Sequence, residues 1–179
     1  RQMCIRDSLR SQKAQNYLRG RCISRDVMEI YNLGFDPADE VVLFPVYSRR
    51  GDVLFYKSRS LVGKHFFNAK DIDKTAAVYG LYQTLEAKIP DSTEIWLVES
   101  EIDALSLVSK GILAWAFMGS DISEKQIKEM CQSPYRRFVI ATDNDEAGRK
   151  AARRIKDKLI PLGFRFFNLK WLTDLKDVN

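Results

Sequence analysis

Residues 95–105 read Ile-Trp-Leu-Val-Glu-Ser-Glu-Ile-Asp-Ala-Leu, and residues 138–149 read Phe-Val-Ile-Ala-Thr-Asp-Asn-Asp-Glu-Ala-Gly-Arg. Each stretch is an apolar run, rich in β-branched and aromatic residues, that ends in carboxylates and continues into a helix-compatible sequence. This pattern predicts a buried strand followed by a helix. In an open parallel α/β sheet, ligands bind at the carboxyl ends of the strands. We therefore expect Glu99, Asp143 and Asp145 to meet at one edge of such a sheet.

Three ionised carboxylates at one sheet edge repel each other and favour a bound cation. A hard, oxygen-seeking ion such as Mg2+ or Mn2+ suits such a cluster and keeps coordination positions open for substrate phosphates. The pattern suggests two-metal phosphoryl transfer, in which divalent ions activate a hydroxyl nucleophile and neutralise the leaving group. Acidic residues at strand ends are nevertheless common, so either stretch taken alone is more often structural than functional.

Strands and helices alternate around both stretches. From Glu94 the predicted order is strand, helix 103–110, strand 112–118, helix 123–131, strand 138–142, helix 146–159 and strand 165–172. Ser123 and Gln126 form a capping-box pattern at the start of one of these helices. The alternation predicts an α/β fold with a parallel four-stranded sheet, right-handed crossovers and flanking helices.

The N-terminal part of the chain predicts a small α+β subdomain. Two short helices fit residues 11–35, the first ending near Gly20 and the second capped by Ser24. Two strand-like runs within residues 41–56, joined by Ser-Arg-Arg-Gly-Asp, predict a β-hairpin. A further helix fits residues 76–88. This order of helices and antiparallel strands differs from the alternation that follows it.

These patterns predict three segments. Residues 1–8 resemble a translated sequencing adapter, so we expect a non-native leader there. The α+β subdomain is predicted to span residues 9–92 and the parallel-sheet domain residues 93–179. Because the chain ends soon after the last predicted strand, we expect the second domain to be truncated at its C-terminus.

Length and composition narrow the possible classes of protein. The chain has 179 residues, 45% of them hydrophobic, and a formal net charge of +5, which is compatible with a polyanionic partner. Three cysteines form no Cys-x-x-Cys pair and there is one histidine, so we expect no zinc site and no disulfide framework. No apolar run approaches the length of a membrane span and no signal peptide is evident, so we expect a cytoplasmic protein.

Basic and aromatic residues alternate just after the predicted hairpin. They are Lys57, Arg59, Lys64, His65, Phe66, Phe67, Asn68 and Lys70. Such a mixture suits a surface that holds phosphates and stacks on bases. It equally suits a solvated strand edge that lysine and arginine protect from pairing with other chains. The pattern alone leaves both interpretations open.

The acidic stretches resemble the two signatures of the Toprim domain, a metal-binding fold found in primases, topoisomerases and some nucleases. The motifs Glu-x-Glu-Ile-Asp-Ala-Leu and Asp-x-Asp-x-Ala-Gly-Arg are similar to those of primases in particular. The segment that contains Tyr17, Leu18 and Ile23, followed by Leu33-Gly34-Phe35, also resembles the start of a primase catalytic core. Ser100 departs from the family, which commonly has glycine there, so the turn after Glu99 has to form without the freedom of glycine.

The resemblance implies roles for acidic residues. Glu99, as a ligand or general base, would act with the metal ligands Asp143, Asp145 and Asp177, the last from a segment that resembles the Lys-Asp-x-Asn of phage primases. Asp174 would assist them. From its spacing, about one helical turn after Glu99, we expect Asp103 to play a supporting role.

The resemblance also implies contacts to nucleotide and template. In primases a Lys-x-Arg pair, a lysine and an asparagine line the nucleotide and template channel, and Lys57, Arg59, Lys64 and Asn68 match them. The predicted helix 146–159 carries many basic residues that read as a solvated face. Arg149 is the exception, since it lies in the first turn beside the acidic residues and is expected to contact phosphate or carboxylate.

The function implied is that of a DNA primase core, which makes short RNA primers on a single-stranded DNA template from ribonucleoside triphosphates. The implied cofactor is Mg2+, with Mn2+ as a substitute, and the implied partner is a replicative helicase, either fused or separate. Two alternatives stay open. One is a Toprim nuclease or topoisomerase-related domain that cleaves DNA, and the other is a non-catalytic nucleic-acid-binding module.

Overall fold

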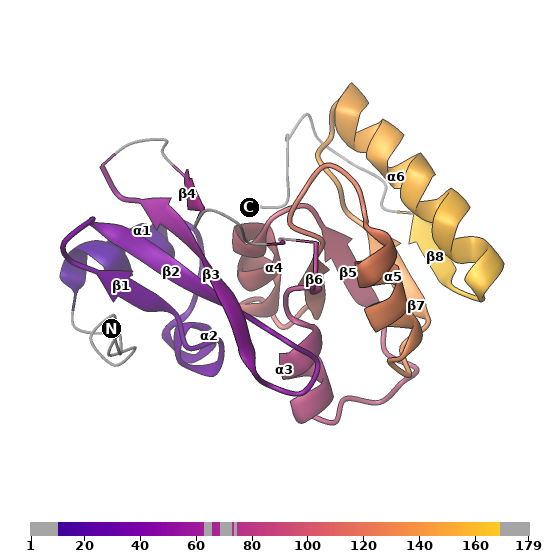
Figure 1. Cartoon of the computed structure of the whole chain (residues 1–179), viewed down its shortest axis with the longest axis horizontal. Coiled ribbons are helices and arrows are strands. Elements are labelled where there is room, and N and C mark those ends of the chain that lie inside the picture. The colour runs from indigo at the N-terminus through magenta and orange to yellow at the C-terminus, as the bar shows by residue number, and fades with distance from the viewer. Residues whose placement is uncertain (1–10, 63–65, 69–72, 74, 169–179) are drawn as a thin grey trace.

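The computed structural model of the chain describes residues 11–62, 66–68, 73 and 75–168. The predicted leader at residues 1–8 lies outside these ranges, as do Lys64, Asp174 and Asp177. Figure 1 shows two sheets side by side, with helix α4 between them. None of the helices in the described ranges is long and apolar enough to cross a membrane.

The N-terminal sheet is antiparallel and has the strand order β1-β2-β3-β4. Its strands are β1 (Gly34–Asp36), β2 (Val41–Tyr47), β3 (Val53–Ser60) and β4 (Phe66–Asn68). The predicted β-hairpin is β2 and β3, in which Phe44 pairs with Lys57. Two helices precede the sheet, α1 (Gln12–Gly20) and α2 (Arg25–Ile30). Ser24 caps α2 by accepting a hydrogen bond from the main-chain N–H of Val27, as predicted.

The second sheet has the order β6-β5-β7-β8, and each neighbouring pair of strands is parallel. Its strands are β5 (Ile95–Val98), β6 (Ala114–Ala116), β7 (Arg137–Ile140) and β8 (Arg165–Asn168). The connecting helices are α4 (Glu101–Val108), α5 (Glu124–Cys131) and α6 (Glu146–Leu159), with the short 3-10 helix η2 (Ile160–Leu162) before β8. This is the predicted fold class, a parallel four-stranded sheet with flanking helices that follows a small α+β region.

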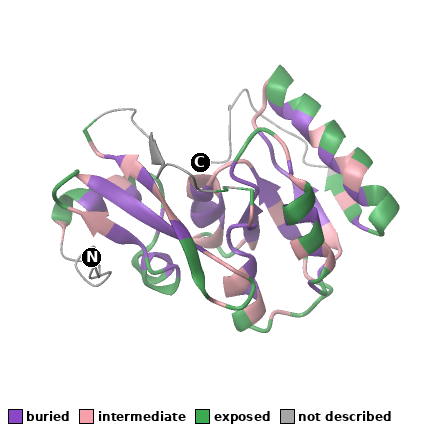
Figure 2. Cartoon of the chain, viewed as in Figure 1, coloured by how far each residue is buried: buried purple, intermediate pink, exposed green. Residues whose placement is uncertain are grey.

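Alternate residues of the parallel sheet pack on opposite faces, and strands β5, β6 and β7 are mostly buried (Figure 2), whereas Arg165 and Phe167 of β8 are exposed. Ile95 and Leu97 pack in a cluster with residues of α5 and α6. Val98 packs in the other cluster, which joins α4 to α1, α2, β2 and β3. One hydrophobic cluster therefore contains residues from both sides of the predicted boundary between residues 92 and 93. That domain boundary stays a prediction.

The segment before β5 differs from the prediction. The predicted helix 76–88 is shorter in the structure, where α3 spans Leu81–Glu86. Tyr79 instead pairs with Ala116 at the edge of the parallel sheet, through two main-chain hydrogen bonds of 3.0 Å. Gly80 then turns the chain with a φ of +88°, and a Cβ at this position would lie 2.7 Å from the Ala114 carbonyl oxygen. Only glycine fits this turn into α3.

Candidate active site

The first acidic loop joins β5 to α4. Glu99 directly follows the strand, and Ser100 is the N-cap of the helix with an extended φ of −115°. The Ser100 hydroxyl accepts a hydrogen bond from the Asp103 N–H (3.2 Å) and donates one to Asp103 Oδ2 (2.6 Å). The turn after Glu99 therefore needs no glycine. The Ser100 side chain caps α4 and holds the start of the helix in this conformation.

The second acidic loop joins β7 to α6. Asp145 is the N-cap of α6, and its Oδ1 accepts a hydrogen bond of 2.8 Å from the Gly148 N–H. The Thr142 hydroxyl donates to the Gly148 carbonyl at 2.9 Å. A Cβ at Gly148 would lie 2.0 Å from the Asp143 carbonyl oxygen. The Asp-x-Asp-x-Ala-Gly pattern is therefore a tight loop in which the glycine lets the first turn of α6 pack against Asp143.

The two loops meet because β5 and β7 are adjacent parallel strands. The main-chain N–H of Asp143 donates a hydrogen bond of 3.2 Å to Glu99 Oε1. Burial raises the pKa of Glu99, and the nearby carboxylates of Asp143, Asp145 and Asp103 raise it further, while the hydrogen bond from Asp143 acts in the opposite direction. Glu99 is therefore a partly buried carboxylate with other carboxylates near it, and both conditions disfavour its ionised form.

The chemistry of these groups suits a hard divalent cation. Carboxylate oxygens are the ligands that Mg2+ and Mn2+ prefer, and a cation would offset the carboxylate repulsion that adds to the effect of burial on the Glu99 pKa. Within the part of the chain that the structure describes, however, no three His, Cys, Asp or Glu side chains are grouped as a metal site. The donor set fits the ion, and the role of each carboxylate as a ligand stays a prediction.

The predicted nucleotide contacts lie on or beside β3. Lys57 is mostly buried, and its Nζ lies 2.5 Å from Oε2 of Glu101 in α4. Arg59 is half-buried, and Asn68 pairs with Lys57 through the main chain of β4. Sequence reasoning missed Glu101 as a partner of Lys57. No local pattern predicts the pair, because the two residues are 44 positions apart.

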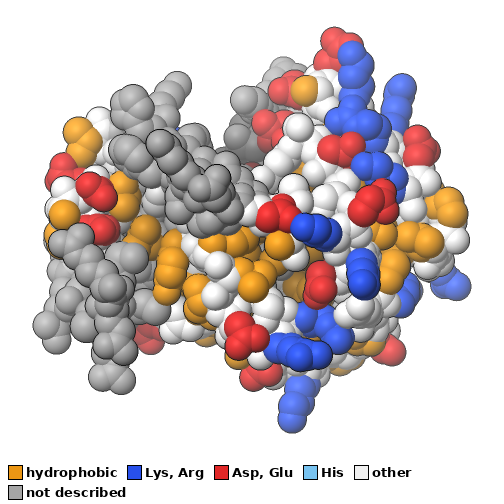
Figure 3. All heavy atoms as spheres, viewed as in Figure 1, with side chains coloured by type: hydrophobic (Ala, Val, Ile, Leu, Met, Phe, Trp, Pro, Cys, Tyr) orange, Lys and Arg blue, Asp and Glu red, His pale blue; other side chains and the backbone are white. Residues whose placement is uncertain are grey.

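The basic helix α6 holds part of the loop after β6. Arg154 and Lys158 both bind Oδ2 of Asp121, at 3.2 and 3.1 Å. Lys150 pairs with Glu146 one turn away. Figure 3 shows lysine and arginine side chains gathered over this helix. Arg149 is exposed in the first turn, next to the second acidic loop, and its predicted contact with phosphate stays a prediction.

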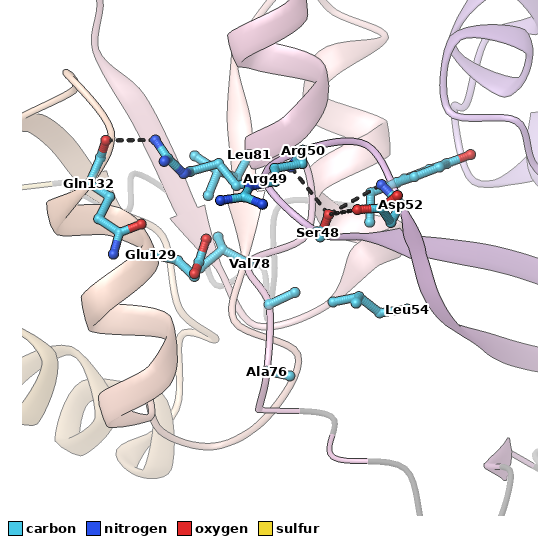
Figure 4. Close-up of a pocket in the computed structure, with 12 residues that line it drawn as sticks. Ser48, Arg49, Arg50, Asp52, Leu54, Ala76, Val78, Leu81, Glu129 and Gln132 are labelled. Atoms are coloured by element: carbon cyan, nitrogen blue, oxygen red, sulfur yellow. Dashed lines mark hydrogen bonds between the residues drawn. The ribbon is translucent and has the colours of Figure 1, made fainter.

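A pocket of about 420 Å³ lies at the turn between β2 and β3. The turn residues Arg49 and Arg50 line it together with Glu129 and Gln132 of the α5 region. Figure 4 shows Arg49 reaching across to the main chain of Gln132, where Nη1 donates to the carbonyl oxygen at 2.9 Å. Glu99, Asp143 and Asp145, the predicted metal ligands within the described residues, do not line this pocket.

Known proteins combine the same two regions. Residues 96–179 match a family described as Toprim-like. The DNA primase of Pseudomonas aeruginosa is 26% identical over 192 residues, which cover 83% of this chain and 29% of the primase. This chain is a homologue of the Toprim-domain DNA primases.

Two further proteins resemble this chain over most of its length. The uncharacterized protein MG010 of Mycoplasma genitalium is 27% identical over 155 residues, which cover 85% of this chain and 71% of that protein. The E. coli primase catalytic core shares the fold, with a TM-score of 0.75 and 24% identity over 96% of this chain and 70% of the core. The chain spans only 29% of the length of the P. aeruginosa primase.

Proposed function

We propose that the chain is the catalytic core of a DNA primase, which synthesises short RNA primers on single-stranded DNA. The observation that carries the proposal is the contact between the two acidic loops, where the Asp143 N–H binds the Glu99 carboxylate. The similarity to DNA primases adds support, because it extends over the N-terminal sheet as well as the acidic domain.

The acidic loops would hold the divalent ions. Glu99, Asp143 and Asp145 are the proposed ligands within the described residues, and Asp177 is a further one from outside them. At these residues a bound Mg2+ or Mn2+ would supply Lewis-acid chemistry, which would activate the primer 3′-hydroxyl and neutralise the pyrophosphate that leaves the incoming ribonucleotide. The chain itself supplies position, because the caps of α4 and α6 fix both loops against the sheet.

The basic residues would hold the polyanionic partners. Arg59, Lys64, Asn68 and Arg149 are the proposed contacts to the DNA template and the ribonucleoside triphosphate. Lys57 matches the same primase pattern, but its ammonium group is paired with Glu101, and it is not among the proposed contacts. A replicative helicase, fused or separate, would deliver the template. Such a reaction belongs in the cytoplasm of a bacterium or of a phage-infected cell.

The test is incorporation of labelled ribonucleotides on single-stranded DNA with Mg2+ or Mn2+, with and without a short annealed RNA. The annealed RNA separates elongation from initiation. The variant is D143N/D145N, which removes both charges but keeps a capping side chain at position 145. The exposed Asp157 on α6 provides the control D157N.

We expect RNA products from the wild type and from D157N, and none from D143N/D145N. Equal RNA synthesis by D143N/D145N and the wild type would contradict the proposed site. Metal-dependent nicking of the template by the wild type would support a Toprim nuclease instead. DNA binding without metal dependence or synthesis would indicate a binding module.

A further inference from the structure

The ion pair between Lys57 and Glu101 joins the two sheets. Lys57 lies in β3, an inner strand of the antiparallel sheet, and Glu101 is the first residue of α4. Their charged atoms are 2.5 Å apart, and the side chains are 13% and 3% exposed. This low exposure distinguishes the pair from ion pairs at the surface, such as Lys13 with Glu40, whose side chains are 52% and 43% exposed.

Glu101 lies within the first acidic loop and its helix cap. Glu99 is two residues before it and Asp103 two residues after it, and Asp103 supplies the N–H that Ser100 caps. A buried carboxylate without its partner is strongly disfavoured, so loss of Lys57 would push Glu101 toward water. Because Glu101 begins α4, such a movement would displace the cap and, with it, Glu99.

The pair also fixes the position of the Lys57 ammonium group, which is bound to Glu101. A buried ammonium group needs a counter-charge, and the Glu101 carboxylate supplies one at 2.5 Å. The bond between Lys57 and Glu101 holds the positive charge at a fixed place on the side of α4. The small exposed fraction of Lys57 leaves little of the side chain for contact with a nucleotide.

We infer that Glu101 is a positioning residue, which holds Lys57 and thereby fixes the start of α4 and the Glu99 carboxylate for metal binding. Lys57 then acts through Glu101 and not by contact with substrate. The inference rests on the proposed primase function for its activity readout, and metal affinity tests it independently.

The variants are E101Q, K57M and K57M/E101M, with K13M as the control from an exposed pair. We expect E101Q and K57M each to lower kcat about 10- to 100-fold, with the KM for ribonucleotide and the affinity for labelled single-stranded DNA within about twofold. The Mn2+ affinity, followed by electron paramagnetic resonance, falls in the same two variants.

Replacing a buried ion pair by apolar residues is often neutral, so K57M/E101M recovers kcat and Mn2+ affinity to within about threefold of the wild type. K13M behaves like the wild type.

A K57M/E101M variant that is folded but as inactive as K57M, with a raised KM for ribonucleotide, would overturn the inference and show that Lys57 contacts substrate. If E101Q or K57M does not fold, kcat, KM and Mn2+ affinity are compared between K57M/E101M and the wild type. A low kcat with a raised KM in the double variant again overturns the inference. If the wild type makes no primers, the proposed function fails, and the Mn2+ affinities still decide. Unchanged Mn2+ affinity in folded E101Q then refutes the positioning role.

Discussion

The acidic loops and the ion pair between the sheets place a glutamate in opposite charge environments, although Glu99 and Glu101 are only two residues apart. Glu99 lies at the partly exposed edge of the parallel sheet, where burial and other carboxylates raise its pKa. Glu101 lies between the sheets and is paired with Lys57. The first environment suits the binding of a cation from solution, whereas the second uses a cation that the chain supplies. Neutralising each glutamate should therefore have opposite effects on stability.

The largest effect is expected from E101Q, which breaks the buried pair. The variant leaves Lys57 buried without a counter-charge, and removal of one partner from such a pair costs about 3 kcal/mol or more. Denaturant unfolding of the wild type and E101Q measures the difference. E29Q is the control, because Glu29 pairs with Arg25 at the surface and its loss costs less than about 0.5 kcal/mol. Similar small losses in both variants would show that the buried pair is not special.

G148A should disrupt the second acidic loop. Its Cβ would lie 2.0 Å from the Asp143 carbonyl oxygen, so the main chain has to move, at a cost of about 2–3 kcal/mol. Thermal unfolding measures the loss, and Mn2+ binding should weaken with it. G20A is the matched control, since a Cβ there meets nothing within 4 Å. A G148A variant as stable as G20A would mean that the loop does not pack in this way.

E99Q should act in the opposite direction to E101Q in metal-free protein, by a smaller amount. Because the folded-state pKa of Glu99 is raised, its ionised form costs stability at pH values above that pKa. The cost shrinks as the pH falls through the raised pKa, and it vanishes below the ordinary value of about 4.5. E99Q is therefore expected to be more stable than the wild type at pH 7–8 and equally stable near pH 4, in unfolding measured across that range. Added Mg2+ should stabilise only the wild type, and a less stable E99Q at neutral pH would contradict this account.

The smallest effect is expected from R49M, at an exposed contact between the turn that follows β2 and the end of α5. Arg49 is exposed and binds the main chain of Gln132, so its loss should cost less than about 0.5 kcal/mol. Denaturant unfolding compares it with E101Q. A loss as large as that of E101Q would show that the turn between β2 and β3 contributes as much to stability as the buried pair.

The parallel sheet was predictable because its signals are local. Apolar runs at regular spacing predicted strands and helices, and the capping box of Ser123 and Gln126 is present in α5 as predicted. Segment 76–80 was mispredicted as helix because its conformation depends on pairing with Ala116, far along the chain. Long-range pairing of this kind leaves no periodic pattern in a short segment.

The candidate site was predictable to the same extent. Carboxylates at the ends of two parallel strands lie at one sheet edge by topology alone, and the structure brings Asp143 and Glu99 into contact. The bond between Lys57 and Glu101 was not predictable, because it depends on how the two sheets pack. From sequence, Lys57 could be read only as a basic residue on a strand.

The central claim is that the two acidic loops bind a divalent cation together. The most direct measurement is a Mn2+ titration of the chain and of D143N/D145N, followed by electron paramagnetic resonance, with D157N as the control. We predict saturable binding to the wild type and D157N that is lost in D143N/D145N and is competed by Mg2+. Equal Mn2+ binding by the wild type and D143N/D145N would contradict the account.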